Sequence, residues 1–313
     1  MESLKVSSLI DDAGREYAAF RRALRPRWWR VAVDLTLGYV MLFATAWLLT
    51  RIGSASIPAL CAAVLVAAVS FGYWMAYLQL FLHEAAHFNL AASRSANDLL
   101  ANLLVASWVG TRIASYRAIH WQHHRFHGET ADTERSYFSA LDARFLLAGL
   151  TGLSALRVIL FRRERLRAAD LPAGGSRLAA QLMALLVHGA VVVGSFMAGH
   201  WLVALAWIVG MGVFFPFFGA LRQLLEHRSA TASAMIDYRN TAHGRTTRMF
   251  REGPMGSTFG AAGFTRHLLH HWDPSVSYSN LGEVEGFLRG CAAARPHLAK
   301  TSYRRAFQEL YGR

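Results

Sequence analysis

Charged residues are scarce in this chain of 313 residues. They make up 17% of the sequence, against roughly 25% in soluble domains, whereas 54% of the residues are hydrophobic. The shortfall comes from long apolar runs and not from an even dilution of charge. Such a composition argues against an ordinary soluble domain and is typical of an integral membrane protein.

Cysteine and the motifs of bound redox groups are scarce or missing as well. Cys61 and Cys291 are the only cysteines and lie far apart, which argues against a disulfide framework and predicts two free thiols. The sequence has no H-P-G-G haem signature and no flavin or iron–sulfur motif. The sequence therefore predicts no haem, flavin or iron–sulfur group bound within the chain.

Lysine is nearly absent, so the net charge of +13 comes almost wholly from arginine, with Lys5 and Lys300 as the exceptions. No nucleic-acid-reading motif accompanies this charge, and we expect no nucleic-acid partner. Arginines that flank apolar runs mark the cytoplasmic side of membrane proteins. Residues 1–30 lack the apolar core of a signal peptide, which predicts an uncleaved N-terminus in the cytoplasm.

Four apolar runs are long enough to cross a bilayer, which needs about 20 such residues. They cover residues 31–50, 57–80, 178–198 and 201–221. Short connections at 51–56 and 199–200 join them into two hairpins, so each hairpin returns to the side on which it starts. The apolar stretch 98–109 is too short to span and is expected to lie in the interface or fold back against the bundle. The predicted fold is all-α and integral to the membrane, with one domain over residues 1–313.

Histidine, in contrast, is abundant and clustered. The clusters are His83-Glu-Ala-Ala-His87, His120-Trp-Gln-His123-His124 and His267-Leu-Leu-His270-His271, and Glu226-His227 follows the fourth apolar run. On a helix, residues three and four apart share a face, so each cluster can aim its imidazoles at a common point. Imidazole suits zinc, copper, iron and nickel, but a single zinc takes only about four ligands. Nine histidines in this spacing fit two metal ions.

The hairpins also predict where these clusters lie. With the N-terminus inside, the ends of the second and fourth runs, the segment between the hairpins and the C-terminal tail all face the cytoplasm. The four histidine elements then form a cytoplasmic helical cap that carries the histidine boxes. Arginines crowd the segment between the hairpins, as this orientation requires: Arg157, Arg162, Arg163, Arg165, Arg167 and Arg177.

The three boxes, in this order around the apolar runs, resemble those of the membrane fatty acid desaturase and hydroxylase superfamily: H-x-x-x-H, H-x-x-H-H and H-x-x-H-H. The likeness covers residues 80–281. Arg222-Gln-Leu-Leu-Glu226-His227 is similar to the family's R-N-x-x-E-H, and Pro274-Ser-Val-Ser-Tyr-Ser-Asn280-Leu281 to its P-S-V-P-x-x-N-L. Gln223 stands where the family often has Asn, so a water-mediated polar contact to one metal ion is expected to differ here.

The resemblance implies two non-haem iron ions and their ligands. The ligands would be His83, His87, His120, His123, His124, His227, His267, His270 and His271. Glu84 and Glu226 adjoin ligands and could accept an imidazole N–H, which fixes the tautomer of the ring. Asp132, Asn280 and Gln223 are expected in similar supporting positions.

The other histidines are expected to have simpler roles. His127 continues the face of the second box, but the family pattern does not require it, which predicts a supporting or surface position. His188 lies inside the third apolar run and is expected to hydrogen-bond between helices. His200, His243 and His297 are expected in turns or on the surface.

The activity that the resemblance implies is an O2-dependent oxidation. It would introduce a C=C bond into a fatty acid or acyl lipid, with two electrons from a ferredoxin or cytochrome b5. A hydroxylase or ketolase of a lipid, isoprenoid or amino-acid-derived molecule has the same box spacing. A zinc protease built on His83-Glu84-His87 would leave six histidines unexplained. A membrane metal transporter should carry its ligands near the middle of the bilayer and not at one face. Phenylalanines of the fourth run could line a substrate slot: Phe214, Phe215, Phe217 and Phe218.

Overall fold

The computed structural model describes residues 4, 9–53, 55–153, 156 and 177–312. The arginines predicted to crowd the segment between the hairpins, from Arg157 to Arg167, lie outside these described residues. The described part is mostly helical, and Cys61 and Cys291 are both free, as the sequence predicts.

Four helices are long and apolar enough to cross a membrane, which confirms the predicted number. They are α2 (Trp28–Thr50), α3 (Ile57–Ala86), α8 (Arg177–Met197) and a fourth, continuous span built from α9 (Trp201–Val209), the π-helical turn η4 (Gly210–Phe214) and α10 (Phe215–His227). The second and fourth spans run six residues beyond their predicted ends at Leu80 and Leu221. These extra turns carry His83 and the Glu226-His227 pair, which therefore lie on rigid helix and not in a loop.

The spans pack around α3, which contacts α2, α9, η4 and α10. Close approach is possible where a side chain is missing: a Cβ added at Gly72 would lie 2.4 Å from the Cβ of Phe214. Small residues let helix backbones approach in this way inside membranes. In α8, by contrast, only 6% of the apolar window is buried, so this helix presents its surface to the surrounding lipid.

The sequence predicts that the short apolar stretch after the first box lies in the interface or folds back against the bundle. The structure shows the second arrangement. The stretch forms α4 (Arg94–Ala101) and the π-helical η2 (Asn102–Ala106), both in contact with α3. The Asn97 side chain donates a hydrogen bond to the carbonyl of Ala85 at 3.0 Å. The chain then enters α5 (Ile113–Phe126), and Arg117 of this helix donates to the carbonyl of Ala86 at 3.0 Å, which places the second box beside the first.

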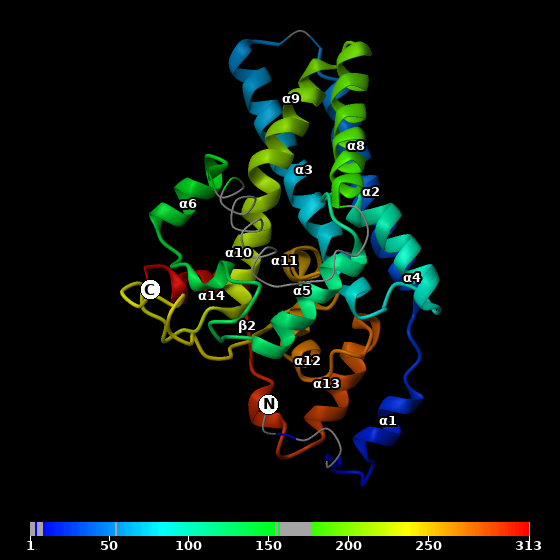
Figure 1. Cartoon of the computed structure of the whole chain (residues 1–313), viewed down its shortest axis with the longest axis vertical. Helices are drawn as coiled ribbons and strands as arrows, with labels where there is room; N and C mark the ends of the chain where they lie inside the picture. Colours follow the sequence, from blue (N-terminus) through cyan, green and yellow to red (C-terminus); the bar gives the residue numbers. More distant parts are fainter. Residues whose placement is uncertain (1–3, 5–8, 54, 154–155, 157–176, 313) are drawn as a thin grey trace.

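Below and beside the spans, the chain forms short helices and loops (Figure 1). The elements are α1 (Tyr17–Ala23), η3 (Ser136–Phe138), α6 (Ala143–Leu150), β1 (Met249–Phe250), α11 (Pro254–Phe259), η5 (Phe264–Arg266), α12 (His267–Trp272), η6 (Tyr278–Asn280), α13 (Leu281–Arg289), η7 (Arg295–His297), β2 (Lys300–Thr301) and α14 (Tyr303–Leu310). The strands β1 and β2 pair in parallel over two residues each, a small sheet that the sequence does not predict. Its pairing joins segments about fifty residues apart, which no local pattern encodes.

The N-terminal segment fastens this lower part to the spans. Tyr17 is fully buried, and its hydroxyl donates to Asp273 at 3.0 Å. Asp34, near the start of α2, pairs with Arg30 at 3.7 Å, and it also accepts a hydrogen bond from the hydroxyl of Tyr278 at 2.8 Å. The N-terminal segment and the start of α2 therefore contact the segment that follows the third box.

Candidate metal centre

The nine histidines that the boxes and the Glu226-His227 pair predict lie together, although they come from four elements. The helices α3, α5, α10 and α12 each present their histidines to one shared, buried site. Figure 1 places α5 and α12 just below the four spans, at one end of the bundle. A tenth histidine, His127, joins them from the end of α5.

The first group contains five imidazoles whose ligand nitrogens all lie within 4.8 Å of one another. Its members are His83, His87, His120, His124 and His270. The Nε2 atom of His120 lies 2.9 Å from that of His87 and 3.1 Å from that of His124. The Nε2 atoms of His124 and His270 are 3.2 Å apart. Histidines from all three boxes therefore converge on one point.

Two further sets of three share His227, one with His123 and His127 and the other with His267 and His271, and we treat these overlapping sets as the second group. The Nε2 atom of His267 lies 3.0 Å from that of His227 and 3.2 Å from that of His271. His123 and His127 also place one ring nitrogen each within 4.8 Å of His227. The two groups adjoin, because the rings of His124 and His271 have centroids only 4.4 Å apart.

These spacings are within hydrogen-bond range, and they also suit nitrogens that share a metal ion. Two metal–nitrogen bonds of about 2.1 Å at a right angle put their nitrogens about 3.0 Å apart, which is the separation seen between successive Nε2 atoms. Several buried ring nitrogens have no hydrogen-bond partner among the described residues, including both nitrogens of His83 and His127. Buried polar atoms without partners are costly, and a bound metal ion would satisfy them.

The rings outside the spans are held in the neutral form that binds metal. Burial lowers the pKa of His87, His124, His267, His270 and His271, and charge interactions among the rings lower it further. His123 is different: burial lowers its pKa, but the nearby carboxylates Glu134 and Asp132 outweigh this effect and raise it. Neutral imidazole is the ligand form, so most of the site is ready for metal at pH 7.

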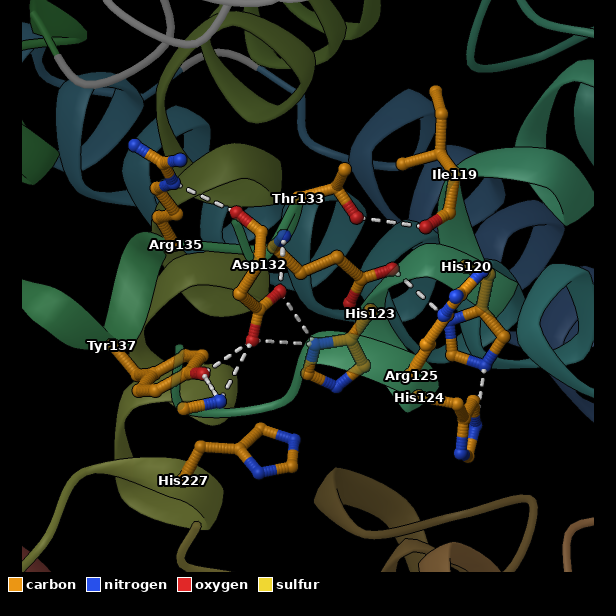
Figure 2. Close-up of polar contacts among 12 residues, drawn as sticks. Ile119, His120, His123, His124, Arg125, Asp132, Thr133, Arg135, Tyr137 and His227 are labelled. Atoms are coloured by element: carbon orange, nitrogen blue, oxygen red, sulfur yellow. Dashed lines mark hydrogen bonds and ion pairs between the residues drawn. The ribbon is translucent and has the colours of Figure 1, made fainter. Parts of the chain in front are cut away.

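Asp132 orients His123, as Figure 2 shows. Its carboxylate oxygens lie 2.9 and 3.0 Å from the Nδ1 atom of His123. The carboxylate is fully buried, and it also accepts hydrogen bonds from the hydroxyl of Tyr137 and from the backbone N–H of Gly128 at 3.2 Å. A carboxylate on Nδ1 leaves Nε2 as the free donor atom, which is how such pairs support metal-binding histidines.

Glu134 has a comparable position, and the sequence analysis missed it. One carboxylate oxygen lies 3.1 Å from the Nδ1 atom of His120, and the other accepts a hydrogen bond from the Gln223 amide at 2.8 Å. Burial alone would raise the pKa of Glu134, but the charge of His123 and the hydrogen bonds from His120 and Gln223 hold it at about 2. The only signal in the sequence was a second acidic residue two positions after Asp132.

Of the remaining predicted supporting residues, two glutamates lie near histidines, whereas Asn280 has a different role. Glu84 lies 3.3 Å from Nδ1 of His83 and 3.8 Å from Nδ1 of His270, and Glu226 lies 4.0 Å from Nε2 of His267. Asn280 does not support a histidine through its hydrogen bonds. Its amide donates to the carbonyl of Arg25 at 3.1 Å, so it fastens the N-terminal segment instead.

Outcomes for the other histidines are mixed. His188 joins two elements as predicted: it bonds the carbonyl of Trp108 at 2.8 Å and accepts from the indole of Trp207 at 3.1 Å. His200 and His297 are exposed, as expected. The expectation for His243 is wrong, because this ring is buried and accepts a hydrogen bond from the N–H of Ser229 at 3.3 Å. A surface position for His127 is excluded as well.

A cavity of about 1320 Å³ reaches the histidines from one side. It exceeds the roughly 300–1,000 Å³ of ordinary ligand pockets. Apolar side chains such as Leu80, Phe145 and Phe264 form part of its wall, and the segment 234–239 contributes polar residues. Of the four phenylalanines expected to line a slot, Phe215 lies in the lining. Five histidines from both groups also line the cavity: His83, His120, His123, His227 and His267.

The four apolar spans and the buried histidines define a helical membrane protein with a polyhistidine site suited to metal. A sequence profile of the fatty acid desaturase family matches residues 59–302, which covers nearly all of α3, the whole second hairpin and all three boxes, but not the first span. The chain therefore belongs to the fatty acid desaturase family. No curated protein matches it. Membership assigns the chain to oxidoreductases of the desaturase and hydroxylase type.

Proposed function

We propose that this protein is an O2-dependent membrane desaturase that holds two iron ions and introduces a C=C bond into an acyl chain. The division of the buried histidines into two adjoining groups is the observation that carries this proposal. The position of both groups at one end of the bundle argues against a transporter, whose ligands would lie between the spans.

The two groups would hold one iron each. The first site would use His83, His87, His120, His124 and His270, and the second His123, His227, His267 and His271. Bound iron supplies the oxidising power that cleavage of an unactivated C–H bond requires and that acid–base side chains lack. The protein fixes the imidazoles on helices, and Asp132 and Glu134 hold the Nδ1 atoms of His123 and His120, so that their Nε2 atoms face the site.

The cavity would take the substrate. Its apolar wall suits an extended hydrocarbon, and histidines of both groups also line it. A chain that enters it would bring one carbon to the metal side while the wall excludes water. Orientation of that carbon by the protein, rather than by a reactive side chain, would decide which bond is oxidised.

The electrons would come from a ferredoxin or cytochrome b5 on the cytoplasmic side. The positive net charge of +13 would favour an acidic donor, and salt would weaken the encounter. This orientation follows from the arginine distribution and the even number of spans.

Expression in cells that supply a compatible reductant tests the proposal. The cells are fed deuterated fatty acids, and their lipids are then analysed by mass spectrometry. We expect a product two hydrogens lighter than its precursor. A His271→Ala variant should abolish the product, whereas His297→Ala, which alters an exposed histidine, should not. An alcohol as the product would replace the desaturase with a hydroxylase, and a purified protein with a single zinc and no iron would overturn both.

A further inference from the structure

His127 is the one histidine of the cluster that neither the three boxes nor the Glu226-His227 pair account for. Its side chain is 2% exposed, and neither ring nitrogen has a hydrogen-bond partner among the described residues. The neutral ring carries one N–H donor and one acceptor, and both would be left unsatisfied in a protein interior. A histidine that only filled space would be better replaced by an apolar residue.

The ring of His127 faces the second group of histidines. Its centroid lies 4.6 Å from that of His227 and 4.7 Å from that of His271. One of its nitrogens lies within 4.8 Å of the ligand nitrogens of His123 and His227. The orphaned donor atoms therefore lie beside the same point on which the second group converges.

The second group is also the one that needs another donor. The first group has five imidazoles, whereas the boxes and the Glu226-His227 pair give the second only four. The polar residue expected near one metal ion, Gln223, does not fill this place. Its amide donates to Glu134, which in turn holds His120 of the first group.

The backbone at His127 is fixed, as a ligand position requires. The next residue, Gly128, has φ +75, and a Cβ there would lie 2.4 Å from the carbonyl oxygen of Gly244. Its N–H donates to the hydroxyl of Tyr137 at 2.8 Å, and its carbonyl accepts from the N–H of His243 at 2.8 Å. These contacts of Gly128 end α5 and fix the backbone from which the ring of His127 projects.

We propose that His127 is a tenth nitrogen ligand, which gives the second metal site five imidazoles like the first. The inference rests on the proposed function, since it concerns the same pair of metal ions. It makes the second site richer in nitrogen than the family boxes alone provide, and it makes Gln223 a support of the first site.

Iron binding by purified protein tests this inference without an activity assay. Wild type, His127→Ala, His127→Gln and His243→Ala are loaded with iron-57 under anaerobic conditions, and iron per chain and Mössbauer spectra are recorded. His243 is the matched control because it is a buried neighbouring histidine whose Nε2 accepts from a backbone N–H. We expect both His127 variants to hold the second iron at least about tenfold more weakly, and free imidazole to restore it in His127→Ala.

Circular dichroism and thermal unfolding of each metal-free variant show whether it folds like the wild type, so that a folding defect is not mistaken for a lost ligand. Variants that fold like the wild type and keep two irons with unchanged spectra would overturn the inference. A wild-type protein that binds fewer than two irons would instead overturn the proposed function.

Discussion

Replacement of Glu134 by Gln tests whether the buried carboxylate supports the metal site. Glu134 accepts a hydrogen bond from the Gln223 amide at 2.8 Å and holds Nδ1 of His120 at 3.1 Å. Glutamine keeps the size and one acceptor but removes the charge, and its own amide would face the Gln223 amide, donor against donor. His120 would then lose the anion that favours its Nε2 atom as the metal-facing one.

The expected loss follows from these contacts. Removing a carboxylate that supports a metal-binding histidine typically lowers metal affinity by about 10–100-fold, which corresponds to about 1.4–2.8 kcal/mol. We expect this loss at the first iron site, to which His120 belongs, and little change at the second. Because the pKa of Glu134 is about 2, the effect should be the same at pH 6 and pH 8.

Competition with a coloured ferrous chelator measures the affinity directly. Glu129→Gln is the matched control: it lies on the same loop, its carboxylate is half-exposed, and its partner is Arg245 at 3.4 Å. The control should bind iron like the wild type. A Glu134→Gln protein whose iron affinity stays within about threefold of wild type, below the tenfold expected for such a support, would refute the supporting role of this residue.

Three further predictions concern stability and are read from thermal unfolding. Gly72→Ala places a Cβ 2.4 Å from a side-chain atom of η4 and should cost about 1–3 kcal/mol, whereas Gly189→Ala meets nothing within 4 Å and should not destabilise; equal effects would contradict the packing. Arg222→Leu leaves the buried carboxyl of Glu226, 3.6 Å away, without its basic partner and should cost about 1–3 kcal/mol, much of it recovered when both become Leu; no recovery would contradict the pairing. Glu285 has a pKa of about 2 because three basic partners outweigh the effect of burial, so it stabilises the fold above pH 4.5 and loses this effect as the pH falls toward 2. Glu285→Gln should therefore cost about 3 kcal/mol at pH 7 and about half of that at pH 3; a pH-independent cost would contradict the assignment.

The sequence predicts most of the secondary structure of the spans. An apolar run must match the thickness of a bilayer, and this requirement alone places α2, α3, α8 and the fourth span. Apolar length does not predict where α3 and α10 end. Their last turns are polar on one side and are buried by the short helices below the spans rather than by lipid. The histidines on those turns could be placed near the membrane but not on rigid helix.

The candidate site shows the same division. The spacing within each box determines that its histidines share a helix face, as His120, His123 and His124 do on α5. Which box meets which is a matter of tertiary contact: His124 belongs with His270 in one group, although its neighbour His123 belongs with His227 in the other. Adjacent residues on a helix point about 100° apart, so one box can serve two sites, but no local pattern says that it does.

The sequence by itself therefore determined the membrane spans, the kind of ligand, the number of metal ions to expect and the family. Only the tertiary structure decided the division into two groups, the inclusion of His127 and the roles of Glu134 and Asn280. The physical reason is the distance along the chain over which each effect acts. Helix periodicity and apolar length act within about twenty residues, whereas these contacts join side chains on different elements. A buried donor atom such as that of His127 is recognised only when its surroundings are known.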